Sequence, residues 1–248
     1  MIYVIGIGSG EKDSMTFGAW AALEKCDVIL GYRKYVELIR KYFPEKIFRE
    51  YSMREEIKRC EYALKISREN PQQIIGLISS GDSGIYGMAG LILELADANG
   101  DSQIEIKIIA GVSASSICAS ILGAPLMNDY VVLSLSDLLT GWEIIERRIR
   151  AACLGDFVIC VFNPVSKSPK RRENFRRACE IMLEYKTPDT PCGFVPNGGR
   201  YGESCEIMTL SEIADCESEL DMFCTLIIGN SQSRIINGKF VTRRGYDM

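Results

Sequence analysis

Three stretches of small and polar residues in this sequence each follow an apolar run. They read YVIGIGSG from residue 3, LISSGDSGIYGMAG from residue 77 and IIAGVSASS from residue 108. Glycine lets a backbone approach a ligand closely, and such turns between a strand and a helix often hold a nucleotide or a phosphate. None of the three contains a lysine or an arginine, and the second supplies the carboxylate of Asp82. We therefore expect a pocket made largely of backbone groups, better suited to a neutral or cationic nucleoside than to a polyphosphate.

Each stretch also has a purely structural interpretation. A glycine turn can pack one backbone against another without any ligand. Asp82 or Ser83 could cap a helix over residues 85–98, and Ser113 could cap a helix over 114–122. These interpretations stay open beside the ligand-binding one.

The known phosphate cradles fit this sequence poorly. No GxxxxGK string followed by Ser or Thr is present, which excludes a P-loop. In the first turn the third glycine of a dinucleotide fingerprint is misplaced, because Gly6, Gly8 and Gly10 are followed by Glu11. The next predicted strand ends in Gly31 and Tyr32, without a carboxylate for a ribose. A nicotinamide-dependent oxidoreductase is thus a weaker alternative, as is a binding subunit without catalytic activity.

The chain contains no histidine, which excludes Ser-His-Asp and Cys-His catalysis and histidine metal sites. Its ten cysteines form no CxxC pair. Several lie within apolar patterns and are predicted to be reduced, buried thiols; these are Cys26, Cys118, Cys160 and Cys179. We therefore predict no bound metal, and any acid–base step falls to Asp, Glu, Tyr, Lys or Cys.

Apolar runs that alternate with helical periodicity predict an α/β protein with a mainly parallel sheet and helices on both of its faces. In the first half the predicted strands are 2–6, 27–31, 74–79 and 104–111, and the predicted helices are 16–25, 32–42, 53–69 and 85–98, with Thr16 as an N-cap. In the second half the predicted strands are 130–136, 156–163, 191–197, 205–210 and 223–230, and the predicted helices are 143–153 and 170–185. The last strands follow one another closely, which favours an antiparallel edge there.

The pattern restarts near residues 111–127. We accordingly predict an N-terminal α/β domain over 1–112, a linker and helix over 113–127, and a C-terminal α/β domain over 128–248. The net charge of −4 over 248 residues argues against nucleic acid as the partner. No apolar run approaches the roughly 20 residues of a membrane span, and no signal peptide is evident, so we expect a cytoplasmic protein.

At these motifs the chain resembles the tetrapyrrole (precorrin/corrin) methylases. YVIGIGSG, GDSGIYGMA and AGVSASS carry the general resemblance, and LSLSDLLTG, FNPVSKSPK, GGRYGE, TLIIGNSQSR and VTRRGY sharpen it. The resemblance implies two α/β/α units with S-adenosylmethionine in a cleft between them, commonly in a homodimer. It further implies methylation of C(17) of cobalt-precorrin-3 or precorrin-3B with contraction of the ring, in cobalamin biosynthesis. Methylation of another precorrin carbon is the alternative within the family.

The resemblance also implies which residues bind the cofactor. The family's second motif usually reads Gly-Asp-Pro, whereas Ser83 replaces the proline here. The implied cofactor-binding residues are Ser9, Gly10, Asp82, Ile85, Ser113, Ala114, Phe162, Asn163, Val195, Asn197 and Gly229.

The implied substrate is an anionic tetrapyrrole, which calls for basic residues that bind its carboxylates. Candidates are Lys167, Lys170, Arg171, Arg172, Arg200, Arg243 and Arg244. Most of the run around 167–177 has the simpler interpretation of a solvated helix face. For catalysis we select Asp137, Arg200 and Glu203, with Tyr201 as a further proton donor. A helix cap or a loop hydrogen bond is the structural alternative for the donors.

Overall fold

A computed structural model describes residues 1–165, 168–216 and 223–247. The chain divides into two compact units, Met1–Ala114 and Ser115–Met248. Both units combine a β-sheet with helices, which confirms the predicted α/β class. Within the described ranges no helix has the length and apolarity needed to cross a membrane.

The first unit contains a five-stranded, wholly parallel sheet with the strand order β3-β2-β4-β1-β5. Its elements are β1 Ile2–Gly6, the 3-10 turn Lys12–Ser14, α1 Phe17–Lys25, β2 Val28–Tyr32, α2 Arg33–Arg40, β3 Ile47–Tyr51, α3 Glu56–Glu69, β4 Ile75–Ser79, α4 Ala89–Ala98 and β5 Ile106–Ile109. Parallel strands need crossover connections, and helices supply them between β1, β2, β3, β4 and β5.

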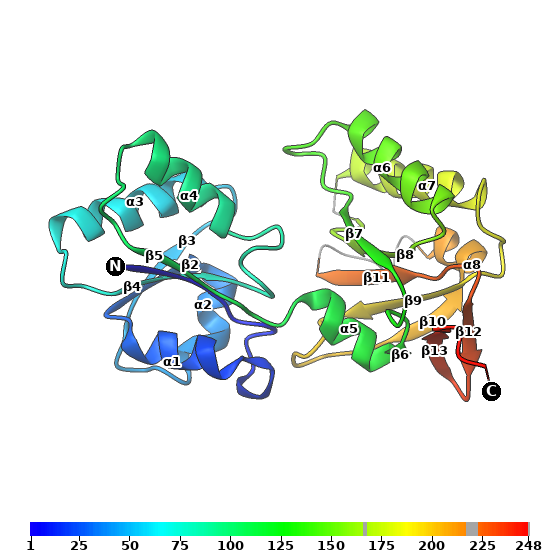
Figure 1. Cartoon of the computed structure of the whole chain (residues 1–248), viewed down its shortest axis with the longest axis horizontal. Helices are drawn as coiled ribbons and strands as arrows, with labels where there is room; N and C mark the ends of the chain where they lie inside the picture. The colour runs from blue at the N-terminus through cyan, green and yellow to red at the C-terminus, as the bar shows by residue number, and fades with distance from the viewer. Residues whose placement is uncertain (166–167, 217–222, 248) are drawn as a thin grey trace. The chain divides into compact units, whose positions relative to one another are not determined.

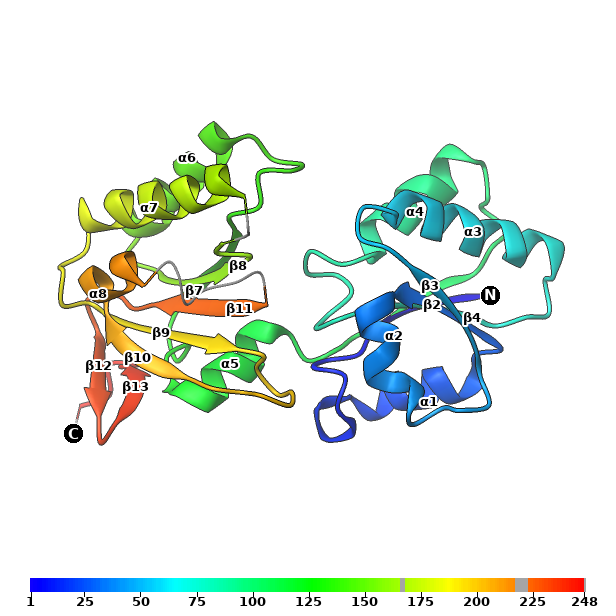
Figure 2. The ribbon, with the colours of Figure 1, turned by 180° about the vertical axis from the view of Figure 1, so that it is seen from behind.

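Helices cover both faces of this sheet, with α1 and α2 on one side and α3 and α4 on the other (Figures 1 and 2). Alternate residues of each strand enter the two cores because successive side chains point to opposite faces. In β1, for example, Val4 packs in the core with α3 and α4, whereas Ile5 packs with α1 and α2. This two-sided burial explains why the strands read as continuous apolar runs.

The second unit contains a mixed sheet with the order β10-β9-β11-β8-β7 and a small sheet with the order β12-β13-β6. Its elements are α5 Ala114–Leu122, β6 Gly123–Ala124, β7 Tyr130–Ser134, α6 Trp142–Leu154, β8 Val158–Phe162, α7 Pro169–Leu183, β9 Pro191–Pro196, β10 Glu206–Thr209, α8 Leu210–Asp215, β11 Cys224–Ile228, β12 Ser233–Ile236 and β13 Lys239–Thr242. β7 and β8 are parallel, and β11 is antiparallel to both β8 and β9. The antiparallel pairing expected among the last strands is therefore confirmed.

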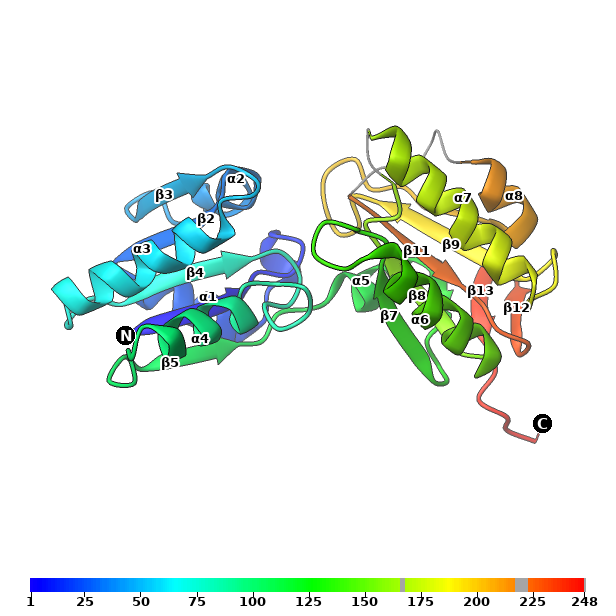
Figure 3. The same cartoon turned by 90° about the horizontal axis from the view of Figure 1, so that it is seen from above.

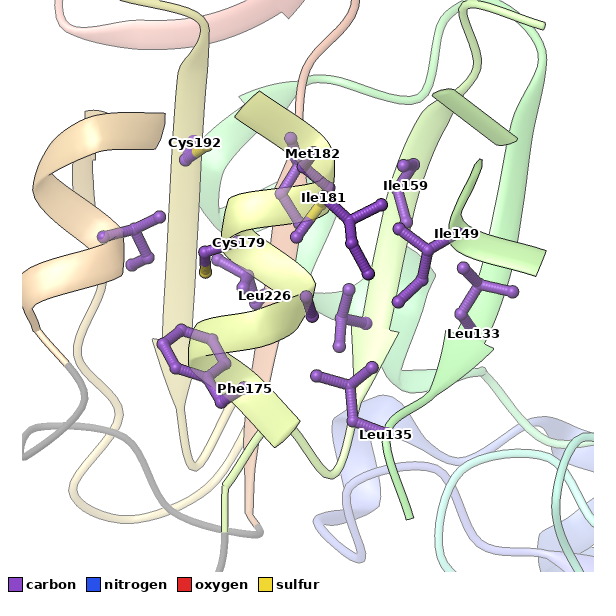
Figure 4. Packing of buried hydrophobic residues seen from close by; sticks show 14 of the residues in the cluster. Leu133, Leu135, Ile149, Ile159, Phe175, Cys179, Ile181, Met182, Cys192 and Leu226 are labelled. Atoms are coloured by element: carbon purple, nitrogen blue, oxygen red, sulfur yellow. The ribbon is translucent and has the colours of Figure 1, made fainter. Parts of the chain in front are cut away.

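Helices α6, α7 and α8 cover one face of the mixed sheet, as seen from above in Figure 3. Phe175 of α7 is fully buried there, and Figure 4 shows it among Cys179, Leu226 and other apolar residues of that face. On the opposite face α5 and Phe240 of the small sheet pack against β8, β9 and β11. The second unit is thus also layered around one sheet.

Several elements differ from the prediction. Helix α4 begins at Ala89 rather than at 85, and β3, β6, α8, β12 and β13 had not been predicted. β3 is an edge strand whose residues are mostly exposed, so its sequence lacks the apolar run that marks the other strands. The predicted N-cap is confirmed, since the Thr16 hydroxyl accepts a hydrogen bond from the Ala19 amide at 3.0 Å.

Candidate functional site

In the first unit, the loops that follow β1, β4 and β5 are joined through their backbones. Gly8 and Gly81 exchange two hydrogen bonds of 3.1 and 2.7 Å. A β-carbon on Gly6 would lie 2.6 Å from the Gly81 carbonyl oxygen, and one on Gly111 would lie 2.2 Å from the same atom. Because these contacts are between backbones, no side chain could move away to make room. The three predicted stretches therefore meet at one edge of the sheet.

Asp82 connects two of these loops. One carboxylate oxygen accepts from the Gly84 amide at 2.8 Å, and the other accepts from the Gly111 amide at 2.9 Å. The alternative that Asp82 or Ser83 caps the following helix is wrong, because the residue before α4 is Met88. The Ser83 hydroxyl instead donates to the Val4 carbonyl oxygen at 3.2 Å and is fully buried. Since a proline has no hydroxyl, the serine in place of the family's proline adds a link between this loop and β1.

The first glycine loop is stabilised by its own side chains. Ser9 is buried, and its hydroxyl forms a hydrogen bond with the Ser14 hydroxyl. Gly10 has a φ of +94°, and a β-carbon there would lie 2.7 Å from Leu38. Glu11 accepts from Lys41 at 2.8 Å and from the Tyr42 hydroxyl at 2.7 Å. Any contact of this loop with a ligand thus falls to its backbone rather than to the Ser9 side chain.

The loop between β4 and α4 presents apolar surface beside Asp82. Ile85 is 39% exposed, and the neighbouring Tyr86, which the sequence interpretation did not select, is 60% exposed with a φ of +53°. Ser113 is buried and Ala114 half-buried at the start of α5. The sequence did offer a signal for Tyr86 as a site residue, because it is an aromatic residue between the two glycines of GIYG. Apolar side chains and backbone groups without a basic residue suit a nucleoside that carries no phosphate.

In the second unit, the predicted residues from β8 and β9 come to one edge of the mixed sheet. Phe162 at the end of β8 pairs in register with Ser134 at the end of β7, and Pro196 at the end of β9 pairs with the start of β11. The side-chain amide of Asn163 donates to the Ser134 hydroxyl at 3.1 Å. Asn163 and Asn197 both adopt the left-handed backbone conformation, which asparagine tolerates better than most residues.

Val195 lies one residue before the end of β9, and its side chain is fully buried against α5 and β8. Only its backbone could therefore contribute to a ligand site.

Gly229 lies at the end of that sheet opposite to Phe162, Asn163 and Asn197. It follows β11, which is antiparallel to β8 and β9, and its amide donates to the carbonyl oxygen of Pro191, the first residue of β9, at 2.8 Å. The adjacent Asn230 side chain donates to the Asp156 carbonyl oxygen at 3.0 Å, and the Ser231 amide donates to the Asp156 carboxylate at 3.1 Å. The GNS motif thus closes a turn onto the segment that precedes β8.

Asp137 follows β7 and forms two ion pairs with the first turn of α7. Its carboxylate lies 2.9 Å from Lys170 Nζ and 3.2 Å from Arg171 Nε. The hydrogen bond from Lys170, assisted by that from Arg171, holds the pKa of Asp137 below its ordinary value of 3.8, although burial opposes this shift. The Asp137 side chain is therefore a carboxylate at neutral pH. The predicted alternative of a helix cap is absent, because no helix begins at Ser136 or Asp137.

The loop between β9 and β10 carries Arg200 and Glu203. The Glu203 carboxylate accepts from the Gly199 amide at 2.7 Å, and the Arg200 amide donates to the Asn197 carbonyl oxygen at 2.9 Å. Arg200 is half-buried, whereas Tyr201 is fully exposed. The loop hydrogen bond expected as an alternative for Glu203 is thus present.

The other basic candidates are dispersed. Lys170 is 75% exposed, as expected of a solvated helix face, but Arg171 is only 13% exposed. Arg243 and Arg244 follow β13 of the small sheet, where the Arg243 amide donates to the Gln232 carbonyl oxygen. Lys167 lies outside the described residues.

Comparison with models of protein families shows which family this chain belongs to. The model of the tetrapyrrole (corrin/porphyrin) methylases matches residues 1–214. This chain belongs to the tetrapyrrole methylases.

Individual methylases extend the match over the whole chain. A Salmonella typhimurium protein named probable cobalt-factor III C(17)-methyltransferase is 41% identical over 248 residues, which cover 100% of both chains. The Archaeoglobus fulgidus cobalamin biosynthesis protein CbiHC is 40% identical over 99% of this chain, and the match spans 52% of that longer protein. The crystal structure of the methyltransferase CobJ superimposes with a TM-score of 0.89 at 30% identity, covering 98% of this chain and 99% of that one.

The cysteines of this methylase behave as predicted. Cys26, Cys118, Cys160 and Cys179 are buried and unpaired. Burial raises the pKa of Cys26 to about 12 and that of Cys118 to about 11, so neither is a thiolate at neutral pH. Among the residues that the structure describes, no group of three or more Cys, Asp or Glu side chains is arranged to hold a metal ion.

Proposed function

We propose that this methylase transfers a methyl group from S-adenosylmethionine to C(17) of an anionic corrin precursor, cobalt-factor III or precorrin-3B, with contraction of the ring. The observation that carries the proposal is the full-length identity of 41% to a protein named probable cobalt-factor III C(17)-methyltransferase. The glycine-lined loops of the first unit support it, because their chemistry fits the cofactor.

The fit concerns charge and shape. S-adenosylmethionine is a sulfonium cation without phosphates, and the segments 6–10, 80–88 and 110–116 contain neither lysine nor arginine. Ile85 and Tyr86 offer apolar surface to an adenine or a methionine chain. A polyphosphate would lack a cationic partner within these loops.

We assign the cofactor to Ser9, Gly10, Asp82, Ile85, Ser113 and Ala114 of the first unit and to Phe162, Asn163, Val195 and Asn197 of the second. In this assignment Ser9 and Val195 contribute their backbones, because their side chains are buried. Asp82 orders the loops around the cofactor through the Gly84 and Gly111 amides. Gly229 is not assigned, because it lies at the opposite edge of its sheet.

When bound, the cofactor would supply an electrophilic methyl group to the ring carbon, with S-adenosylhomocysteine as the leaving group. The ring nitrogen lone pair supplies the electrons at the attacking carbon, so the transfer itself needs no strong protein base. The protein must hold the two partners in line, and such positioning can lower a barrier by about 7–11 kcal/mol. On the substrate side we assign Asp137, Arg200 and Glu203, together with Lys170 and Arg171 for carboxylates.

The experiment is incubation with S-adenosylmethionine that carries a ¹³C-labelled methyl and with either tetrapyrrole, followed by mass spectrometry and NMR of the product. We expect one labelled methyl at C(17) and a contracted ring. A label at another carbon would mean that the protein methylates a different position of the ring. The absence of any transfer would refute the proposal. The alternative of a binding subunit without catalytic activity is separated by the same assay, because such a subunit transfers no methyl.

A further inference from the structure

The segment between β7 and α6 carries two adjacent leucines that are not packed into the second unit. Leu138 is 57% exposed and Leu139 is fully exposed. The flanking residues Leu135 and Trp142 are both buried in the core beneath α6 and α7. The leucines therefore project from a short loop, residues 135–141, whose two ends are fixed in the core.

An ion-pair network holds the base of this loop. Arg171 is 13% exposed and donates from Nε to Asp137 at 3.2 Å and from Nη2 to the Ser136 hydroxyl at 2.7 Å. The Ser136 amide donates to the Ser134 hydroxyl at 3.2 Å, and the same hydroxyl accepts from Asn163 at 3.1 Å. The loop is thus connected both to α7 and to the strand end assigned to the cofactor.

The charged groups beside the leucines are divided between the two ends of the loop, with two cations at Asp137 and the carboxylate of Glu143 beside Gly141. Asp137 carries one negative charge, and it faces two cations, Lys170 and Arg171. Lys170 is 75% exposed, so its ammonium group can reach a second anion. Apolar surface beside an exposed cation fits an amphipathic anion with a broad apolar face and carboxylates at its rim.

We propose that loop 135–141 binds the substrate, with Leu138 and Leu139 against the face of the tetrapyrrole ring and Lys170 with Arg171 on one of its carboxylates. Asp137 is then a positioning residue, which holds the loop and the guanidinium in place, and not the proton donor. The inference rests on the proposed function and names residues that act in it.

The test compares Leu138→Ser/Leu139→Ser with wild type and with Leu154→Ser. Leu154 is 79% exposed at the far end of α6, near the start of β8, and is a matched control. The readouts are the Kd of the tetrapyrrole, the Kd of S-adenosylhomocysteine by calorimetry, and the oligomeric state by light scattering. We expect the double variant to weaken tetrapyrrole binding by about 10-fold or more, because apolar area buried against the ring is lost, while S-adenosylhomocysteine binding stays unchanged. The control should behave as wild type.

Asp137→Asn separates positioning from proton donation. Loss of positioning predicts a KM for the tetrapyrrole raised by about 10-fold with kcat within about twofold, and partial recovery in Asp137→Glu. A fall in kcat at constant KM would instead make Asp137 the proton donor and overturn its assignment.

Two results would overturn the loop assignment while the proposed function stands: unchanged tetrapyrrole affinity in the double leucine variant, or conversion of a dimer to a monomer, which would make the leucines a contact between copies. If wild type neither binds nor methylates a tetrapyrrole, the proposed function and this inference fall together.

Discussion

The carboxylate of Asp82 accepts a hydrogen bond from the Gly111 amide at 2.9 Å and so joins the loop after β4 to the loop after β5. Its second oxygen accepts from the Gly84 amide, which closes the turn after β4. A residue that we propose to bind the cofactor therefore also joins the backbones of two loops. Stability and ligand binding should be coupled at this position.

Replacing Asp82 by alanine removes both acceptors and leaves two amides without these partners. We expect Asp82→Ala to lower the free energy of unfolding by about 1–3 kcal/mol, and S-adenosylhomocysteine affinity to fall with it. Asp82→Asn keeps one acceptor oxygen and should lose less. Urea unfolding and calorimetry measure the two effects, and an Asp82→Ala protein of wild-type stability would contradict the structural role.

Gly111→Ala tests the close approach of the three glycine loops. A β-carbon would lie 2.2 Å from the Gly81 carbonyl oxygen, so the backbones must separate. We expect a loss of about 3 kcal/mol or more in the free energy of unfolding. Gly90→Ala is the matched control, since an added β-carbon at Gly90 of α4 would meet no atom within 4 Å and alanine favours helix. Thermal melts of both variants provide the measurement. Equal melting temperatures would contradict the close packing of Gly111 against the Gly81 carbonyl oxygen.

Asn230→Ala and Asn163→Ala should separate the two edges of the second sheet. Asn230 is buried, donates to the Asp156 carbonyl oxygen and accepts from the Gln232 amide, so its loss should cost about 1–3 kcal/mol of stability. Because Asn230 lies at the end of its sheet opposite to Asn163, S-adenosylhomocysteine affinity should stay within about twofold of wild type. Asn163→Ala should instead weaken that affinity. The reverse pattern in calorimetry would mean that the GNS turn, rather than the end of β8, holds the cofactor.

The ion pairs of Asp137 predict a defined pH dependence. A carboxylate whose pKa is lower in the folded state stabilises the protein above its unfolded pKa, and this contribution disappears as the pH falls through the folded pKa. Since the folded pKa lies below 3.8, the stability difference between wild type and Asp137→Asn should be constant from about pH 5 to 8, near 1 kcal/mol, and should shrink below about pH 4. Urea unfolding of both proteins across this range provides the measurement. A difference that grows on acidification would refute the assigned direction.

Thiol titration checks the burial of the cysteines. Of the ten, Cys205 is exposed and Cys216 half-buried, and the other eight are buried. We expect one thiol to react rapidly with a disulfide reagent in the native protein, Cys216 to follow more slowly, and the rest to react only on unfolding. Cys205→Ser should remove the rapid phase, and a rapid phase that survives this change would mean that a buried thiol is accessible.

The sequence by itself determined the class of the fold and the meeting of the three glycine-rich loops of the first unit. Apolar runs that alternate with helical periodicity specify local conformation, and helices between strands imply parallel pairing, so β1, β4 and β5 had to end at one edge. The same patterns correctly marked the buried cysteines, because an apolar run carries its thiols into the core.

Tertiary structure decided what depends on strand direction and on distant partners. Gly229 follows β11, and only the antiparallel pairing of β11 with β8 and β9 sends it to the edge opposite Asn163. The close spacing of the last strands favoured antiparallel pairing there, but it did not specify that β11 lies between β8 and β9. Asp137 and Arg171 are 34 residues apart, and their ion pair exists because α7 returns its first turn to the end of β7. Local patterns specify periodicity and burial, whereas the partner of a charged side chain is set by how the elements pack.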